Sequence, residues 1–115
     1  MIFVHLYWKG KQMEYKILRT DKAEDQLRDI IFYIADDSGN EDIALAYLDK
    51  IEGAIHCLRK FPKSGSEPRY SVLKKHGYRV VIVERPLVFY KINDTEQTII
   101  IYAIVDGRRE YHNLL

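Results

Sequence analysis

Apolar residues in the first half of the chain recur every three or four positions, the spacing that places them on one face of a helix. Two such sets occur: Ala23, Leu27, Ile30, Ile31 and Ile34, and then Ala44, Leu48, Ile51, Ile55 and Leu58. Thr20-Asp21 followed by Glu24 resembles a capping box, and Phe61-Pro62 cannot continue a helix. The pattern predicts helices over about residues 22–37 and 41–60, joined as an antiparallel hairpin.

Short runs of β-branched and aromatic residues dominate the second half of the chain. Together with one run before the first helix, they predict four strands, at about residues 15–19, 78–84, 87–92 and 98–105. Residues 98–105 are apolar almost throughout, as expected for a central strand. The order β-α-α-β-β-β predicts an α+β fold, a small antiparallel sheet with the helical hairpin packed on one face.

The hairpin and the sheet are expected to share one hydrophobic core. The side chains predicted to be largely buried in it are Ile30, Ile34, Leu48, Ile51, Ile55, Val81, Phe89, Ile101 and Tyr102. A chain of 115 residues, 47% of them hydrophobic, has enough apolar surface for one domain with one core.

The remaining composition argues against membranes, disulfides and metals. The longest apolar stretch near the N-terminus, residues 2–8, is far shorter than the roughly 20 residues that span a bilayer, so we expect a cytoplasmic protein without membrane contact. Cys57 is the single cysteine, and the four histidines form no metal-binding motif. We therefore expect neither a metal nor a cofactor.

The net charge of +1 conceals a separation of charge along the chain. Acidic residues exceed basic ones by five in residues 14–59, whereas basic residues are in excess by four in residues 60–115. Such a separation is typical either of two surfaces with different partners or of ordinary solvated helix faces, and the sequence leaves both open.

Three segments resemble toxins of the RelE/ParE family of type II toxin-antitoxin systems, and they resemble ParE more than the RelE nucleases. They are Phe61-Pro62-Lys63-Ser64-Gly65, the stretch from Gly77-Tyr78-Arg79 to Leu87-Val88-Phe89-Tyr90-Lys91-Ile92, and Gly107-Arg108-Arg109-Glu110-Tyr111 with Leu114-Leu115. The resemblance covers about residues 13–115. Residues 1–12 are then an N-terminal extension, an extra edge strand, or the product of a start codon placed too far upstream.

The resemblance implies a toxin that inhibits bacterial growth, contributes to plasmid stabilisation and is neutralised by a cognate antitoxin. Operator DNA would be bound only through that antitoxin. The family divides into toxins that bind DNA gyrase and ribosome-dependent mRNA endoribonucleases that need no metal. A third possibility is an inactive member that only binds its antitoxin.

The candidate site residues lie in the basic half of the chain. For a nuclease they are Arg79, Lys91, Arg109, Tyr111 and His112, with Arg108 as a further cation and Glu84 or His76 as further groups for proton transfer. For a surface that binds the target or the antitoxin they are Arg79, Lys91, Arg108, Arg109 and Tyr111. Arg79 and Lys91 are expected on the open face of the sheet.

Two departures from the nuclease pattern favour binding over cleavage. Leu87 stands where similar RelE-type nucleases often have an arginine, three residues before Tyr90. The late tyrosine of those nucleases would fall near Leu115, and Tyr111 does not match it. A toxin that binds gyrase is therefore the preferred hypothesis, with the nuclease and the inactive member as alternatives.

Overall fold

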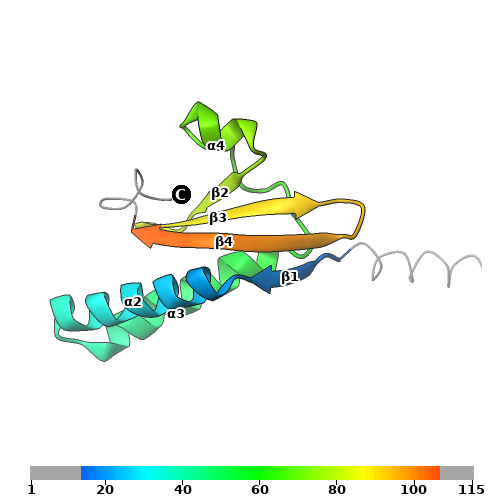
Figure 1. Cartoon of the computed structure of the whole chain (residues 1–115). Helices are drawn as coiled ribbons and strands as arrows, with labels where there is room; N and C mark the ends of the chain where they lie inside the picture. The colour runs from blue at the N-terminus through cyan, green and yellow to red at the C-terminus, as the bar shows by residue number, and fades with distance from the viewer. Residues whose placement is uncertain (1–13, 107–115) are drawn as a thin grey trace, which may run out of the picture.

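The computed structural model describes residues 14–106 (Figure 1). Its elements in chain order are β1 (Lys16–Arg19), α2 (Asp21–Ser38), α3 (Glu41–Cys57), α4 (Ser71–Lys75), β2 (Arg79–Ile82), β3 (Pro86–Asn93) and β4 (Thr98–Asp106). The predicted α+β fold with its four strands and helical hairpin is confirmed. The short helix α4 was not predicted, because its five residues are too few to show a helical period.

The four strands form one sheet in the order β1-β4-β3-β2. β4 lies inside the sheet as predicted, and the pairs β2–β3 and β3–β4 are antiparallel. β1, however, runs parallel to β4, so the sheet is mixed and the prediction of an antiparallel sheet was wrong for this pair. The alternation of side chains along a strand is the same in both directions, so it predicts a strand and not its orientation.

Side-chain caps set the boundaries of the two long helices. The Thr20 hydroxyl accepts a hydrogen bond from the Ala23 N–H at 3.1 Å, and the Asn40 side chain accepts one from the Asp42 N–H at 2.8 Å. Gly39 ends α2 in a left-handed conformation with φ of 67°, which a glycine adopts without strain. α3 ends at Cys57, three residues earlier than predicted.

Two hydrophobic cores lie on opposite faces of the sheet. The larger one fills the space between the helical hairpin and the sheet, and it contains Ile30, Ile51 and Ile101. The smaller one lies on the other face, where Leu73 of α4 covers Phe89. The predicted single core was therefore incomplete, since α4 builds a second one.

Three of the side chains predicted to be largely buried are only partly so: Leu48, Val81 and Tyr102. Leu48 and Val81 pack against the larger core from its margin. Tyr102 lies on the face that the hairpin does not cover, as described below. Among the helices in the described part of the chain, none is long and apolar enough to cross a membrane.

The cores make a first prediction for the free energy of unfolding. Ile51 is fully buried, so Ile51→Ala should lower this free energy by about 2–5 kcal/mol in denaturant titrations. Leu45 lies on the same helix with 53% of its surface exposed, so Leu45→Ala should change it by less than about 0.5 kcal/mol. Similar losses for the two variants would contradict the assignment of the core.

Candidate functional site

The face of the sheet opposite the helical hairpin carries two tyrosines around a lysine. Tyr78 directly precedes β2, Lys91 is on β3 and Tyr102 is on β4. The Lys91 Nζ lies 4.6 Å from the centre of the Tyr78 ring and 5.6 Å from that of the Tyr102 ring. The two rings meet edge to face with their centroids 5.6 Å apart. We name these three residues the tyrosine–lysine cluster.

An irregularity in the β3–β4 ladder brings Tyr102 into this cluster. Phe89 pairs with Ala103, but the next residue, Tyr90, pairs with Ile101. Tyr102 is thus an extra residue in β4, as in a β-bulge, and it shares a face with its sequence neighbour Ala103. The cluster therefore begins where the cover provided by α4 ends.

The chemistry available to the cluster is attraction and stacking. Burial, together with the neighbouring hydroxyl of Tyr102, raises the pKa of Tyr78 above its ordinary value of 10.0. Tyr78 is therefore a neutral phenol near pH 7, which can donate a hydrogen bond but is a poor general base. The ammonium of Lys91 adds a positive charge between two aromatic rings, an arrangement suited to an anionic or flat partner group.

Arg79 does not join Lys91, contrary to the expectation that both lie on the open face. Arg79 pairs with Tyr90, whose side chain is buried in the core beneath the helical hairpin. Directly paired residues point to the same face, so Arg79 and Lys91 point to opposite faces. The Arg79 guanidinium donates hydrogen bonds to the carbonyl oxygens of Lys63, at 3.0 Å, and of Gly65.

These hydrogen bonds belong to a junction between β3 and the loop after α3. The Tyr90 hydroxyl donates to the Pro62 carbonyl at 2.7 Å and accepts from the Gly65 N–H at 3.1 Å. A Cβ on Gly65 would lie 2.6 Å from this hydroxyl and 2.7 Å from the Val80 carbonyl oxygen. Residues 61–65, one of the segments that carry the family resemblance, therefore have a structural role that requires glycine at position 65.

Glu84 and His76 lie apart from one another. Glu84, in the turn between β2 and β3, forms an ion pair with Lys50 of α3. Lys91 lies five residues beyond the start of β3 at Pro86, a separation of about 16 Å along a strand, so Glu84 cannot exchange a proton with a group bound at Lys91. His76 is exposed at the C-terminal end of α4.

Arg108, Arg109, Tyr111 and His112 lie outside the described residues. The structure does describe the point from which they continue, because Asp106 is the last residue of β4. Its side chain is only 4% exposed and accepts a hydrogen bond from Arg85 at 2.6 Å. This hydrogen bond and the charge of Asp106 raise the pKa of Arg85. The end of β4 is thus fixed by an ion pair with a buried carboxylate.

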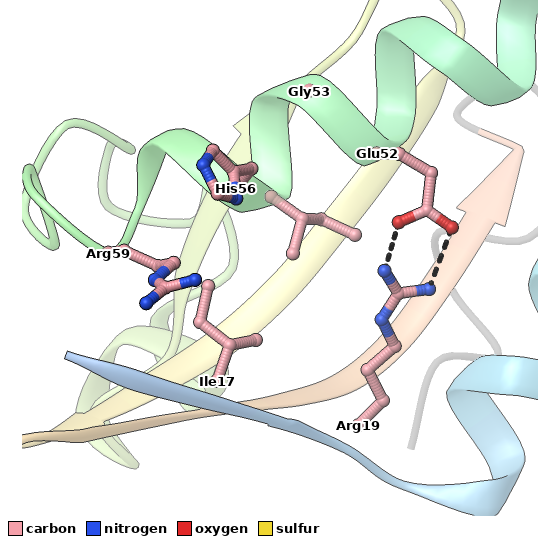
Figure 2. A pocket seen from close by; sticks show the side chains of 7 residues that line it. Ile17, Arg19, Glu52, Gly53, His56 and Arg59 are labelled. Atoms are coloured by element: carbon pink, nitrogen blue, oxygen red, sulfur yellow. Dashed lines mark hydrogen bonds and ion pairs between the residues drawn. The ribbon is translucent and has the colours of Figure 1, made fainter.

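A pocket between β1 and α3 was not predicted from the sequence (Figure 2). Ile17 and Arg19 of β1 line it from one side, and Glu52 and His56 of α3 from the other. Arg19 forms an ion pair with Glu52 across the pocket, and this hydrogen bond raises the pKa of Arg19. Arg19 and Glu52 are far apart in the sequence. The only signal for this pocket in the sequence was the alternation that places Ile17 and Arg19 on one face of β1. No group of three or more metal-binding side chains occurs within residues 14–106.

Comparisons with known proteins identify relatives of the fold. A family model described as the ParE toxin of the type II toxin-antitoxin system, parDE, matches residues 17–111. A structure described as the chromosomal ParDE TA system from P. aeruginosa is similar with a TM-score of 0.66 and 19% identity, covering 82% of this chain and 97% of that chain. The toxin-antitoxin complex RelBE2 from Mycobacterium tuberculosis gives 0.56 and 19%, covering 82% and 92%. No curated protein matches the chain.

The junction around Gly65 predicts opposite effects for the same substitution at two glycines. Gly65→Ala should lower the free energy of unfolding by about 1–3 kcal/mol, because the added methyl group overlaps Tyr90 and a backbone carbonyl. Gly53→Ala should raise it by about 0.5–1 kcal/mol, since Gly53 lies within α3 and its Cβ would meet no atom within 4 Å. Chemical unfolding of both variants measures the difference. An unchanged free energy of unfolding in Gly65→Ala would contradict the requirement for glycine at this position.

Proposed function

The chain belongs to the ParE toxin family of type II toxin-antitoxin systems, and from this membership we propose that it arrests bacterial growth by binding a DNA topoisomerase, gyrase. The toxin acts in the cytoplasm, without chemistry of its own. A cognate antitoxin covers the same surface and so keeps the toxin silent. Plasmid stabilisation follows where the two genes are carried on a plasmid.

One observation carries the choice of binding over cleavage: Arg79 is turned away from Lys91. RNA cleavage through the 2′-hydroxyl needs a base, an acid and cations that stabilise the charge on the phosphate. In the part of the chain that the structure describes, the open face offers Lys91 between two tyrosines, and Arg79 is occupied by the carbonyls of residues 63 and 65. This arrangement resembles a binding surface more than a phosphate clamp.

The tyrosine–lysine cluster has the composition of a protein-binding surface. Tyrosines supply large contact area at a small cost in side-chain entropy and are common among the residues that dominate binding energy. A lysine held against their rings adds attraction for a carboxylate of the partner. An acidic antitoxin segment that crosses the cluster would exclude the target by occupying the same groups. The similar structures from P. aeruginosa and M. tuberculosis are themselves described as toxin-antitoxin systems, which supports such a partner.

A ribosome-dependent mRNA endoribonuclease is the second candidate. Its support is the pair of aromatic rings at Tyr78 and Tyr102, on which a base can stack. In that case Arg109, Tyr111 and His112 would supply the cation and the proton transfer that the described residues of the open face do not.

The two candidates differ in what the purified toxin does when freed from its antitoxin. As a gyrase-binding toxin it should inhibit DNA supercoiling by gyrase and leave mRNA on translating ribosomes intact. Cleavage of mRNA in the ribosomal A site with normal supercoiling would overturn the proposal in favour of the nuclease. Normal supercoiling and intact mRNA, together with normal growth on expression, would identify an inactive member that only binds its antitoxin.

Substitutions separate the cluster from the C-terminal segment as the contact surface. Lys91→Ala should weaken gyrase inhibition about 10-fold, the factor that corresponds to one contact of roughly 1.4 kcal/mol. Arg28→Ala removes the same charge from the outer face of α2 and should leave inhibition unchanged. The double change Arg108→Ala, Arg109→Ala should abolish growth arrest at equal protein levels. If it does not, the C-terminal segment is not part of the active surface.

A further inference from the structure

Residues 59–79 form a strongly basic part of a nearly neutral protein. They contain seven lysines and arginines and one acidic residue, Glu67. The helical hairpin, residues 21–57, has the opposite balance, with three basic and ten acidic residues. The net charge of +1 therefore hides two regions of opposite sign, each large enough to select a partner by electrostatics.

Hydrogen bonds and one ion pair gather this basic segment at one end of the sheet. Ser66 and Val80 form an antiparallel bridge, with hydrogen bonds of 2.9 Å in both directions, and this bridge ties the loop to the outer edge of β2. Lys74 forms an ion pair with Glu67 at 3.3 Å, which ties α4 to the loop before it. The backbone carbonyl of Lys63 accepts a hydrogen bond from the Arg79 guanidinium, at the start of β2, at 3.0 Å. The segment therefore wraps around the β2 edge of the sheet, from the loop after α3 to α4 on the opposite face.

The arginines and the lysines of the segment have different roles. Arg59 forms an ion pair with Glu14 at 3.3 Å, Arg69 lies over the Tyr70 ring, and Arg79 binds backbone carbonyls. Three lysines share two properties, an exposed side chain and no ion-pair partner within residues 14–106: Lys60, Lys63 and Lys75. The rigid guanidiniums thus contact other parts of the protein, while three flexible ammonium groups face solvent.

From this division we infer that residues 59–79 bind the phosphate backbone of double-stranded DNA, without reading its sequence. Contact with a phosphate backbone needs positive charges but no fixed fork geometry, and lysine binds phosphate as a flexible point charge. Phe61, 63% exposed between Lys60 and Lys63, adds an apolar contact surface beside them. The acidic hairpin is repelled by DNA, so it orients the basic end toward the duplex.

This DNA contact goes beyond the proposed function, because it requires no topoisomerase. Under the proposed function it would act on the DNA that gyrase holds, next to the bound toxin. Operator recognition would still depend on the antitoxin, since backbone contacts carry no sequence information.

The number of free lysines fixes the expected salt dependence. Displacement of counterions gives a slope of log K against log salt of about −0.9 for each phosphate neutralised on B-form DNA, so three lysines predict a slope near −2.7. Binding of the full chain to a short mixed-sequence duplex, measured by fluorescence anisotropy between low and moderate salt, tests this value. A second duplex of unrelated sequence should bind equally well.

A triple variant and a matched control locate the surface. Lys60→Gln, Lys63→Gln and Lys75→Gln together should bring the slope close to zero. The control Lys16→Gln, Lys22→Gln and Arg28→Gln removes the same net charge from exposed positions on β1 and α2, and it should keep the slope of the unaltered protein. Circular dichroism and thermal melting of each variant establish that the fold is intact.

Three results would overturn the inference. The first is no measurable binding to duplex DNA at low salt. The second is an unchanged slope in the triple variant, which would mean that another part of the chain contacts the DNA. The third is equal or tighter binding to poly-glutamate at the same charge concentration, which would make the surface a docking site for an acidic protein. Gyrase inhibition is measured separately. A failure of DNA binding therefore does not contradict the proposed function, and a failure to inhibit gyrase does not contradict DNA binding.

Discussion

The fold depends on the burial of β4, the strand that pairs with β1 on one side and β3 on the other. Its first half alternates between partly and fully buried residues, and from Ala103 to Asp106 every residue is buried. A strand buried on both faces needs cover from two sides. The helical hairpin covers one face along the strand, and the short helix α4 covers the second face only near its end. Tyr102 lies where this second cover stops, and the tyrosine–lysine cluster is built around that position.

The two faces of the sheet are covered by different segments, and the acidic and basic residues lie on these different segments. The hairpin needs a long apolar face toward the sheet and presents its acidic residues to solvent, whereas the segment after it crosses the sheet edge with few apolar residues. That segment stays folded through contacts of Tyr90, Arg79 and Gly65 with its backbone. Tyr90 and Arg79 thus stabilise the segment, and the side chains of the lysines around them remain available for a partner.

The sequence predicted the elements well and their relative placement less well. Helix periodicity, the cap at Thr20 and the stop at Phe61-Pro62 located the hairpin to within a few residues, because these signals are local. The parallel β1–β4 pair and helix α4 were missed, since both depend on contacts between distant segments. The candidate site was only partly predicted for the same reason. Which face Arg79 and Lys91 point to depends on strand register, and an arginine held by carbonyls looks in the sequence like one that binds a target.

The two edges of the sheet are protected to different degrees, and this difference limits how partners can approach. At the edge formed by β2, the Ser66–Val80 bridge occupies the outward N–H and C=O of Val80, so it shortens the backbone edge that is open to a partner. The edge formed by β1 has four residues, as β2 does, and in a parallel ladder alternate residues bond to the neighbour. Lys16 and Thr20 donate to Gln97 and Ile101 of the sheet, so Ile17 and Arg19 direct their backbone groups outward, beside the pocket under α3. β1 therefore presents two residues with outward backbone groups for strand addition, and around β2 the bridge leaves a larger role for charge and aromatic surface.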